Sequence, residues 1–165
     1  YPEQWKIRVD GVEIWKEYVE RLPWLKQFYN RIYIGDIYEL IDKLPRYELI
    51  IAGDVIEHLP KNRGQEIIRK CIRLARRKFI LSIPVGDWTD NKIVANNPYE
   101  AHRSVWWARD LIRIGKEELG IPIKTYAHEG IRGGYCVAIY DKAKRGEHEW
   151  SLSRTTQKAR RMKMS

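Results

Sequence analysis

Tyr47-Glu48-Leu49-Ile50-Ile51-Ala52-Gly53-Asp54-Val55-Ile56-Glu57-His58-Leu59 is the most informative segment of the sequence. Its apolar run breaks at Gly53 and Asp54, and Glu57 and His58 follow closely. An apolar run without alternation predicts a strand over residues 48–52 that is buried on both faces of a parallel sheet. Ligands of such α/β sheets bind where strands end, so we expect the polar residues after this strand to face a site.

The composition indicates one globular domain. Of the 165 residues, 44% are hydrophobic and 12% aromatic, and no stretch approaches the ~20 apolar residues of a membrane helix. Cys71 falls in a helical pattern and Cys136 in a strand pattern. We therefore expect two buried free thiols and a cytoplasmic protein, because thiols stay reduced in that compartment.

The net charge of +9 is concentrated at the C-terminus. Residues 142–165 hold eight Lys or Arg and two Glu, a charge of +6, which leaves +3 for residues 1–141. The sequence thus divides into a domain over residues 1–141 and a basic tail over residues 142–165. Such a tail can bind the phosphate backbone of RNA. A solvated, disordered end is an interpretation of equal weight.

Strand and helix patterns alternate along the domain. Further strands are expected over residues 7–14, 31–34, 79–84, 123–127 and 135–140. Helices are expected over residues 15–29 with a break at Pro23, and over residues 37–44, 61–77 and 104–119, the last with Ser104 as its cap. A short glycine-rich turn joins the last two strands, which must therefore be antiparallel, whereas the preceding alternation implies parallel crossovers.

The segment from Asp54 to Leu59 and the terminal hairpin resemble the class I S-adenosylmethionine-dependent methyltransferases. The resemblance covers nearly all of residues 7–141. It implies a Rossmann-like, three-layer α/β sandwich whose mostly parallel sheet ends in an antiparallel hairpin. It also implies S-adenosylmethionine as the cofactor.

The resemblance begins at the family's second strand. No glycine precedes Gly11, so residues 1–6 hold neither the family's first strand nor its Gly-x-Gly-x-Gly loop. We expect these parts to precede Tyr1 in a longer protein, because a sheet without them has a gap in its middle. The alternative is a true loss, which gives a protein that binds the cofactor poorly or not at all.

The resemblance assigns four residues to the cofactor. Glu13 ends a strand and matches the acid that binds the ribose hydroxyls. A helix N-terminal acid is the alternative, and we favour the ribose role. Asp36 matches the acid near the adenine, with Ile37 packing beside the ring, but Asp36 can equally be only a helix cap. Asp54 follows the next strand, where family members contact the methionine part of the cofactor or the substrate.

Asp54, Glu57 and His58 are the candidate catalytic residues, with His102 beyond the next strand. Their i, i+3, i+4 spacing places the first three on one face of a helical turn. The layout is similar to metal-dependent members of the superfamily, in which a divalent cation binds acceptor hydroxyls. We favour an acid/base or substrate-binding site over a metal site or a structural role, and assign no metal.

Aromatic residues after the fourth strand are the expected wall of the acceptor pocket: Trp88, Tyr99, Trp106 and Trp107. Neighbours on a helix point in different directions, so one of the two adjacent tryptophans can instead belong to the core.

The function expected from these features is methyl transfer from S-adenosylmethionine to a hydroxyl or similar acceptor on a small molecule or RNA. The alternative is a non-catalytic binding module or partner subunit that keeps the fold. A nicotinamide-dependent Rossmann enzyme is the weakest candidate, since its glycine fingerprint is missing and its fold does not require the hairpin.

Overall fold

A computed structural model describes residues 6–87, 96–130 and 133–142 of the chain. Short elements make up its N-terminal part. They are strand β1 (Asp10–Glu13), helix α1 (Lys16–Arg21), the 3₁₀ helix η1 (Pro23–Gln27), strand β2 (Arg31–Ile34), helix α2 (Ile37–Leu40) and the 3₁₀ helix η2 (Ile41–Lys43). The break expected at Pro23 is confirmed, because Pro23 ends α1 and opens η1.

Longer elements follow. They are strand β3 (Tyr47–Gly53), the 3₁₀ turn η3 (Ile56–His58), helix α3 (Lys61–Leu74), strand β4 (Ala75–Val85), helix α4 (Ala108–Ile112), the π-helical segment η4 (Arg113–Glu118) and strands β5 (Ile123–Gly130) and β6 (Gly133–Asp141). The alternation and the terminal hairpin are confirmed, since β5 and β6 pair antiparallel.

The strands form two hydrogen-bonded sheets. One contains β1 and β2, and the other has the order β3-β4-β6-β5. The pairs β1–β2 and β3–β4 are parallel, whereas β6 is antiparallel to both of its neighbours. The mostly parallel sheet expected from the sequence is thus half antiparallel in the described residues, and it is divided between β1 and β3.

Strand β3 is an edge strand of the larger sheet, which corrects the expectation that both its faces are buried. Ile51 is 66% exposed and Leu49 46% exposed. Ile51 shares its face with Tyr126 and Tyr135, which are also exposed, while Phe79 and Leu81 alternate onto the other face and are fully buried. The apolar run therefore marks a strand that is buried on one face only.

Side chains, rather than backbone ladders, join the two sheets at both ends. The Tyr47 hydroxyl at the start of β3 donates to Asp10 at the start of β1 over 2.7 Å. Beyond the other ends, the Tyr18 hydroxyl of α1 donates to Glu100 over 2.9 Å. Strands β1 and β3 therefore run in the same direction.

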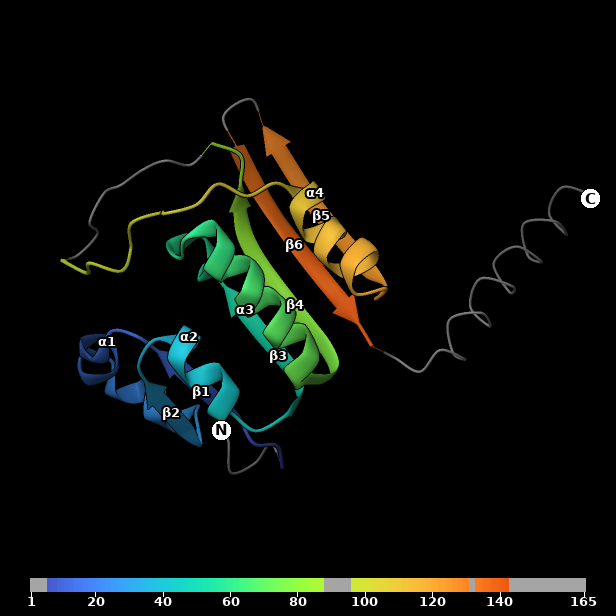
Figure 1. Cartoon of the computed structure of the whole chain (residues 1–165). Helices are drawn as coiled ribbons and strands as arrows, with labels where there is room; N and C mark the ends of the chain where they lie inside the picture. The colour runs from blue at the N-terminus through green and yellow to red at the C-terminus, as the bar shows by residue number, and fades with distance from the viewer. Residues whose placement is uncertain (1–5, 88–95, 131–132, 143–165) are drawn as a thin grey trace, which may run out of the picture.

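Helices α3 and α4 cover one face of the larger sheet, as Figure 1 shows. The amphipathic pattern of α3 is confirmed, because its buried residues are Gly64, Ile67, Ile68, Cys71 and Ile72. Between the helices and the sheet lie the largest buried side chains, Trp106, Tyr140 and Phe79, with the last two rings stacked at 5.5 Å. This core fixes the strand ends at which the candidate site lies.

Two helix boundaries differ from the expectation. Helix α3 ends at Leu74 rather than Arg77, because Ala75 already pairs with Tyr47 in the sheet. Helix α4 begins at Ala108, not at Ser104, and the Asp110 carboxylate accepts the Trp107 backbone N–H over 3.0 Å. Gly120 ends the helical segment with φ of 61°, as its sequence position predicts.

Both cysteines are buried and lie outside any disulfide, which confirms that expectation. Burial raises the pKa of Cys71 to about 12, so its thiol is inert. Among the described residues, no helix is both long and apolar enough to cross a membrane.

Gly64→Ala tests the packing of α3. A Cβ at Gly64 would lie 2.7 Å from Trp106 Cζ2 and 3.0 Å from Ile56 Cγ2. Alanine normally stabilises a helix relative to glycine by about 1 kcal/mol, but we expect a net destabilisation of about 1–3 kcal/mol from overpacking. Thermal unfolding followed by circular dichroism measures it.

The matched control is Gly53→Ala, since nothing lies within 4 Å of a Cβ there. We expect its free energy of unfolding to change by less than about 0.5 kcal/mol. Equal melting temperatures for the two variants would contradict the proposed packing of α3 against Trp106.

Candidate active site

Carboxylates follow the C-terminal ends of three strands. Glu13 ends β1, Asp36 lies just beyond β2, and Asp54 comes directly after β3. Parallel strands gather such ends at one edge of a fold, where ligands of α/β proteins bind. The three predicted site residues therefore follow strand ends, and the structure shows how each side chain is held there.

Glu13 and Asp36 both bind backbone N–H groups. Glu13 Oε1 accepts from Trp15 N over 2.8 Å, and Asp36 Oδ1 accepts from Tyr38 N over 2.8 Å at the start of α2. The capping alternative for Asp36 is thus present in the structure. Each carboxylate keeps a second oxygen without a hydrogen bond among the described residues, so capping leaves one acceptor for a ligand. Ile37 is half-buried and packs against the main core.

Asp54 does not share a helical face with Glu57 and His58. It has φ of 49°, in the left-handed region, and precedes the 3₁₀ turn η3. The expectation of an i, i+3, i+4 helical face is therefore wrong. The left-handed residue redirects the chain after β3, so Asp54 is exposed while Glu57 turns inward.

Glu57 is the most unusual group of the site. It is 1% exposed, and neither of its carboxylate oxygens has a hydrogen-bond partner among the described residues. Burial, with smaller contributions from the charges of Asp54 and Glu100, raises the pKa of this carboxyl from 4.5 to about 7. A carboxyl that titrates near neutral pH can accept or donate a proton during a reaction.

Two histidines lie beside Glu57. His58 Nε2 is 4.0 Å from Glu57 Oε1, and the rings of His58 and His102 meet edge to face with centroids 5.0 Å apart. His102 comes from the segment after β4, far along the chain from η3. The structure thus brings together Glu57, His58 and His102, with ligand atoms within 4.8 Å of one another.

The expected aromatic wall is present only in part. Trp106 is fully buried and belongs to the core, which confirms the alternative kept for one of the two tryptophans. Trp107 and Tyr99 are 38% and 40% exposed and remain candidates for acceptor contacts. Trp88 lies outside the described residues.

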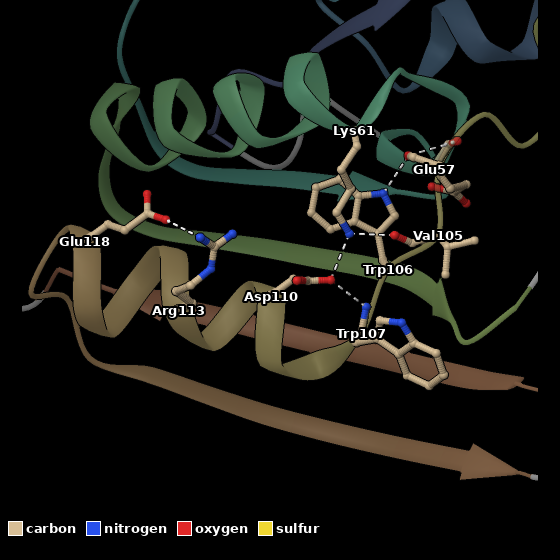
Figure 2. A network of polar contacts seen from close by, with 9 residues as sticks. Glu57, Lys61, Val105, Trp106, Trp107, Asp110, Arg113 and Glu118 are labelled. Atoms are coloured by element: carbon tan, nitrogen blue, oxygen red, sulfur yellow. Dashed lines mark hydrogen bonds and ion pairs between the residues drawn. The ribbon is translucent and has the colours of Figure 1, made fainter.

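Lys61 fixes the segment that carries His102, a role that the sequence analysis missed. Figure 2 shows Lys61 reaching from α3 across the Trp106 ring, with Nζ 3.8 Å from the ring centroid. Its Nζ also donates to the Val105 carbonyl and, over 2.8 Å, to Asp110. A lysine at the first turn of an amphipathic helix carries no sequence signal for such a contact.

Glu100 and Asn97 are two further residues that the sequence analysis missed. Glu100 Oε1 accepts from the Tyr18 hydroxyl and from Asn97 Nδ2 over 3.0 Å, and Asn97 is buried. These bonds attach the segment after β4 to α1. In the sequence, an asparagine directly before Pro98 was the only signal for this contact.

The fold is similar to that of solved methyltransferases. A magnesium protoporphyrin IX methyltransferase from Synechocystis PCC 6803 with bound SAH matches with a TM-score of 0.57 and 21% identity, over 82% of this chain and 64% of that chain. An O-methyltransferase family protein from Burkholderia thailandensis matches with a TM-score of 0.58 and 8% identity, over 85% and 45%. An arsenic (III) S-adenosylmethionine methyltransferase from Chlamydomonas reinhardtii matches with a TM-score of 0.55 and 17% identity, over 85% of this chain and 56% of that chain.

These identities of 8–21% establish the fold alone. The chain has the class I S-adenosylmethionine-dependent methyltransferase fold, as its resemblance predicted. It spans 45–64% of the length of the three structures. In sequence, no family profile and no curated protein matches the chain.

Glu57→Gln tests the buried carboxyl in metal-free protein kept in chelator. Because the folded state holds this proton more tightly than the unfolded state, stability falls as pH rises from 4.5 to about 7. The variant lacks this decrease. We expect its stability advantage over the parent to grow by at most about 3 kcal/mol from pH 4.5 to pH 8. Urea unfolding of both proteins at both pH values measures this change. A difference in unfolding free energy that is the same at pH 4.5 and pH 8 would contradict the raised pKa of Glu57.

Proposed function

We propose that this chain forms the acceptor side and part of the cofactor side of an S-adenosylmethionine-dependent methyltransferase. The observation that carries the proposal is the unpartnered Glu57 carboxyl, with a pKa of about 7, beside His58 and His102. It lies beyond β3 in a fold whose solved representatives include proteins with bound SAH and SAM.

The second oxygens of Glu13 and Asp36 fit a ligand that carries hydroxyl or amino groups, since a carboxylate oxygen accepts from both. In the proposed complex Glu13 holds the ribose hydroxyls and Asp36 the adenine amino group. Ile37 packs beside the ring, and Asp54 contacts the methionine part. The bound cofactor would supply a methyl group on a positively charged sulfonium.

The acceptor is a hydroxyl or a similar group that must lose a proton before it attacks. Glu57 takes that proton, and the imidazoles of His58 and His102 hold the acceptor oxygen beside it. Tyr99 and Trp107 line the exposed rim, where aromatic rings can orient a flat acceptor. Positioning of this kind is the main contribution that a protein makes to methyl transfer.

The space between β1 and β3 is the second element of the proposal. Its two bordering strands run in the same direction and have unpaired inner edges among the described residues. We infer that the whole protein places a further parallel strand there, with a crossover helix over the exposed face near Ile51 and Tyr126. Such a strand would bring a phosphate-like loop to the cofactor.

The same gap favours a second candidate function. Without a strand between β1 and β3, the chain would be a binding module or partner subunit that keeps the fold but no working cofactor loop. The two buried thiols are consistent with a cytoplasmic location for either candidate.

Titration calorimetry with S-adenosylhomocysteine tests the cofactor site. Glu13→Gln and Asp36→Asn keep an amide oxygen for the backbone N–H that each caps, but remove the charge. We expect each variant to bind about tenfold or more weakly, since a hydrogen bond to a charged group contributes about 1.5–3 kcal/mol.

Glu20→Gln is the matched control for that titration, because Glu20 lies on the exposed face of α1 and pairs only with Lys16 among the described residues. Its affinity should equal that of the parent. The titration is made on the whole protein, which includes the inferred strand. Absence of binding there, or equal affinity in all variants, would contradict the methyltransferase proposal and favour the binding module.

A truncation after Lys142 separates RNA from small-molecule acceptors. Lys142 is retained because its Nζ donates to the carbonyls of Arg73 and Ala75 at the end of α3. If residues 143–165 bind RNA, their removal should weaken binding and make its salt dependence shallower, by ~0.7 in log–log slope for each phosphate that they neutralise. Filter binding at several salt concentrations measures this, and an unchanged slope would exclude an RNA role for these residues.

A further inference from the structure

The cluster of Glu57, His58 and His102 has the composition of a metal site. Each residue offers one ligand atom, and these atoms all lie within 4.8 Å of one another. The residues come from two segments, the turn η3 after β3 and the segment after β4. One carboxylate and two imidazoles are the donor set found in many sites with an open coordination position.

The Glu57 carboxylate is the observation that points to a ligand. It is 1% exposed, and both of its oxygens lack a hydrogen-bond partner among the described residues. A buried carboxylate in this state is destabilising unless it is protonated, paired or bound to a cation. Burial keeps water from hydrogen bonding to this carboxylate. A cation that binds here therefore displaces no hydrogen bond from its ligand.

The backbone of Glu57 holds His102 in place. The Glu57 carbonyl accepts the backbone N–H of Arg103 over 2.8 Å and that of Ser104 over 3.1 Å. These are the two residues directly after His102. The same residue therefore supplies a carboxylate and anchors the segment that brings the second histidine to it.

The His58 ring is already oriented as metal-binding histidines are. Its Nδ1 lies 3.3 Å from the Ala101 carbonyl, so Nδ1–H is the donor in that bond and Nε2 carries the lone pair. That Nε2 is the atom 4.0 Å from Glu57 Oε1. A backbone carbonyl on the far ring nitrogen is the usual way in which proteins fix the tautomer of a metal ligand.

We propose that Glu57, His58 Nε2 and a ring nitrogen of His102 bind one divalent transition-metal ion, with a further position open to an acceptor oxygen. Zinc bonds of ~2.0–2.2 Å place tetrahedral ligand atoms about 3.3–3.5 Å apart. The ligand atoms lie within 4.8 Å of one another in the structure, so side-chain rotation on binding would have to close the cluster to that spacing. Two nitrogen donors select Zn²⁺-like ions over Mg²⁺, which prefers oxygen ligands.

The role of this ion in catalysis rests on the proposed function, whereas its binding does not. With the ion bound, Glu57 would be a ligand and no longer the proton acceptor. The ion would then activate the acceptor hydroxyl by lowering its pKa and fixing its oxygen. Asp54, exposed and near Glu57, adds negative charge that favours a cation but is not within the cluster of ligand atoms.

Zinc titration into untagged, chelator-stripped protein without S-adenosylmethionine tests the proposal. We expect one Zn²⁺ per chain by calorimetry, and a raised melting temperature, because a ligand that binds only the folded state stabilises it. Co²⁺ should give the visible absorption of a tetrahedral complex, and Mg²⁺ at the same concentration should give neither effect.

Glu57→Gln and His102→Ala should each lower Zn²⁺ affinity by about tenfold or more. His128→Ala is the matched control, since His128 is exposed on β5, outside the cluster, and should bind like the parent. Circular dichroism checks that every variant folds, and His58→Ala replaces either one that does not. Absence of Zn²⁺ binding, parental affinity in the two cluster variants, or weakened binding in His128→Ala would overturn the site. Cofactor binding is measured separately, so either proposal can fail alone.

Discussion

The packing of Trp106 against helix α3 is the constraint on which the site depends. The ring lies so close to Gly64 that a single added carbon would clash, and the Lys61 ammonium lies over the ring. Trp106 Nε1 donates to Ser104 Oγ over 2.8 Å, and its carbonyl accepts from Gly86 N at the end of β4. A buried indole with its N–H paired is therefore the anchor of the segment that presents His102. Together with the two backbone N–H groups that donate to the Glu57 carbonyl, this anchor brings His102 to His58.

A second constraint is the division between the sheets. Polar side chains connect β1 to β3 at their starts, through Tyr47 and Asp10, and beyond their ends, through Tyr18 and Glu100. Burial opposes ionisation of Asp10, but the hydrogen bonds from Arg8 and Tyr47 hold the pKa of its carboxyl below the usual value. Burial, and then the hydrogen bond to Asp10, raises the pKa of Tyr47, so this pair persists as a neutral phenol on a carboxylate. The candidate cofactor residues on one sheet are thus held beside the candidate acceptor residues on the other, although no backbone ladder joins them among the described residues.

The chemistry of the site follows from one carboxyl group, that of Glu57, which is buried without hydrogen bonds to its oxygens among the described residues. Most of the core satisfies its polar groups, as Tyr140 does by donating to the Leu111 carbonyl. Glu57 does not, because both of its carboxylate oxygens are buried without a hydrogen bond among the described residues, and the packing of the rest of the core must offset that cost. Groups held in this way are reactive because their surroundings cannot stabilise the ionised form, so proton transfer and cation binding draw on the same property.

Several features could be predicted from the amino-acid pattern alone: the order of elements, the terminal hairpin, the break at Pro23, the buried thiols and the strand ends that carry the acids. These depend on local periodicity and on residues with one dominant conformational preference. The prediction that Asp54 shares a helical face with Glu57 and His58 was wrong, because Asp54 itself has a positive φ and lies before the turn η3. The sequence also could not show that β3 is exposed on one face, that Trp106 belongs to the core or that Lys61 anchors the His102 segment. Those features are set by which strand pairs with which and by contacts between residues far apart in the chain. The meeting of Glu57 with His58 and His102 was likewise decided only by the tertiary structure, because His102 reaches the cluster through long-range packing and not through any sequence spacing.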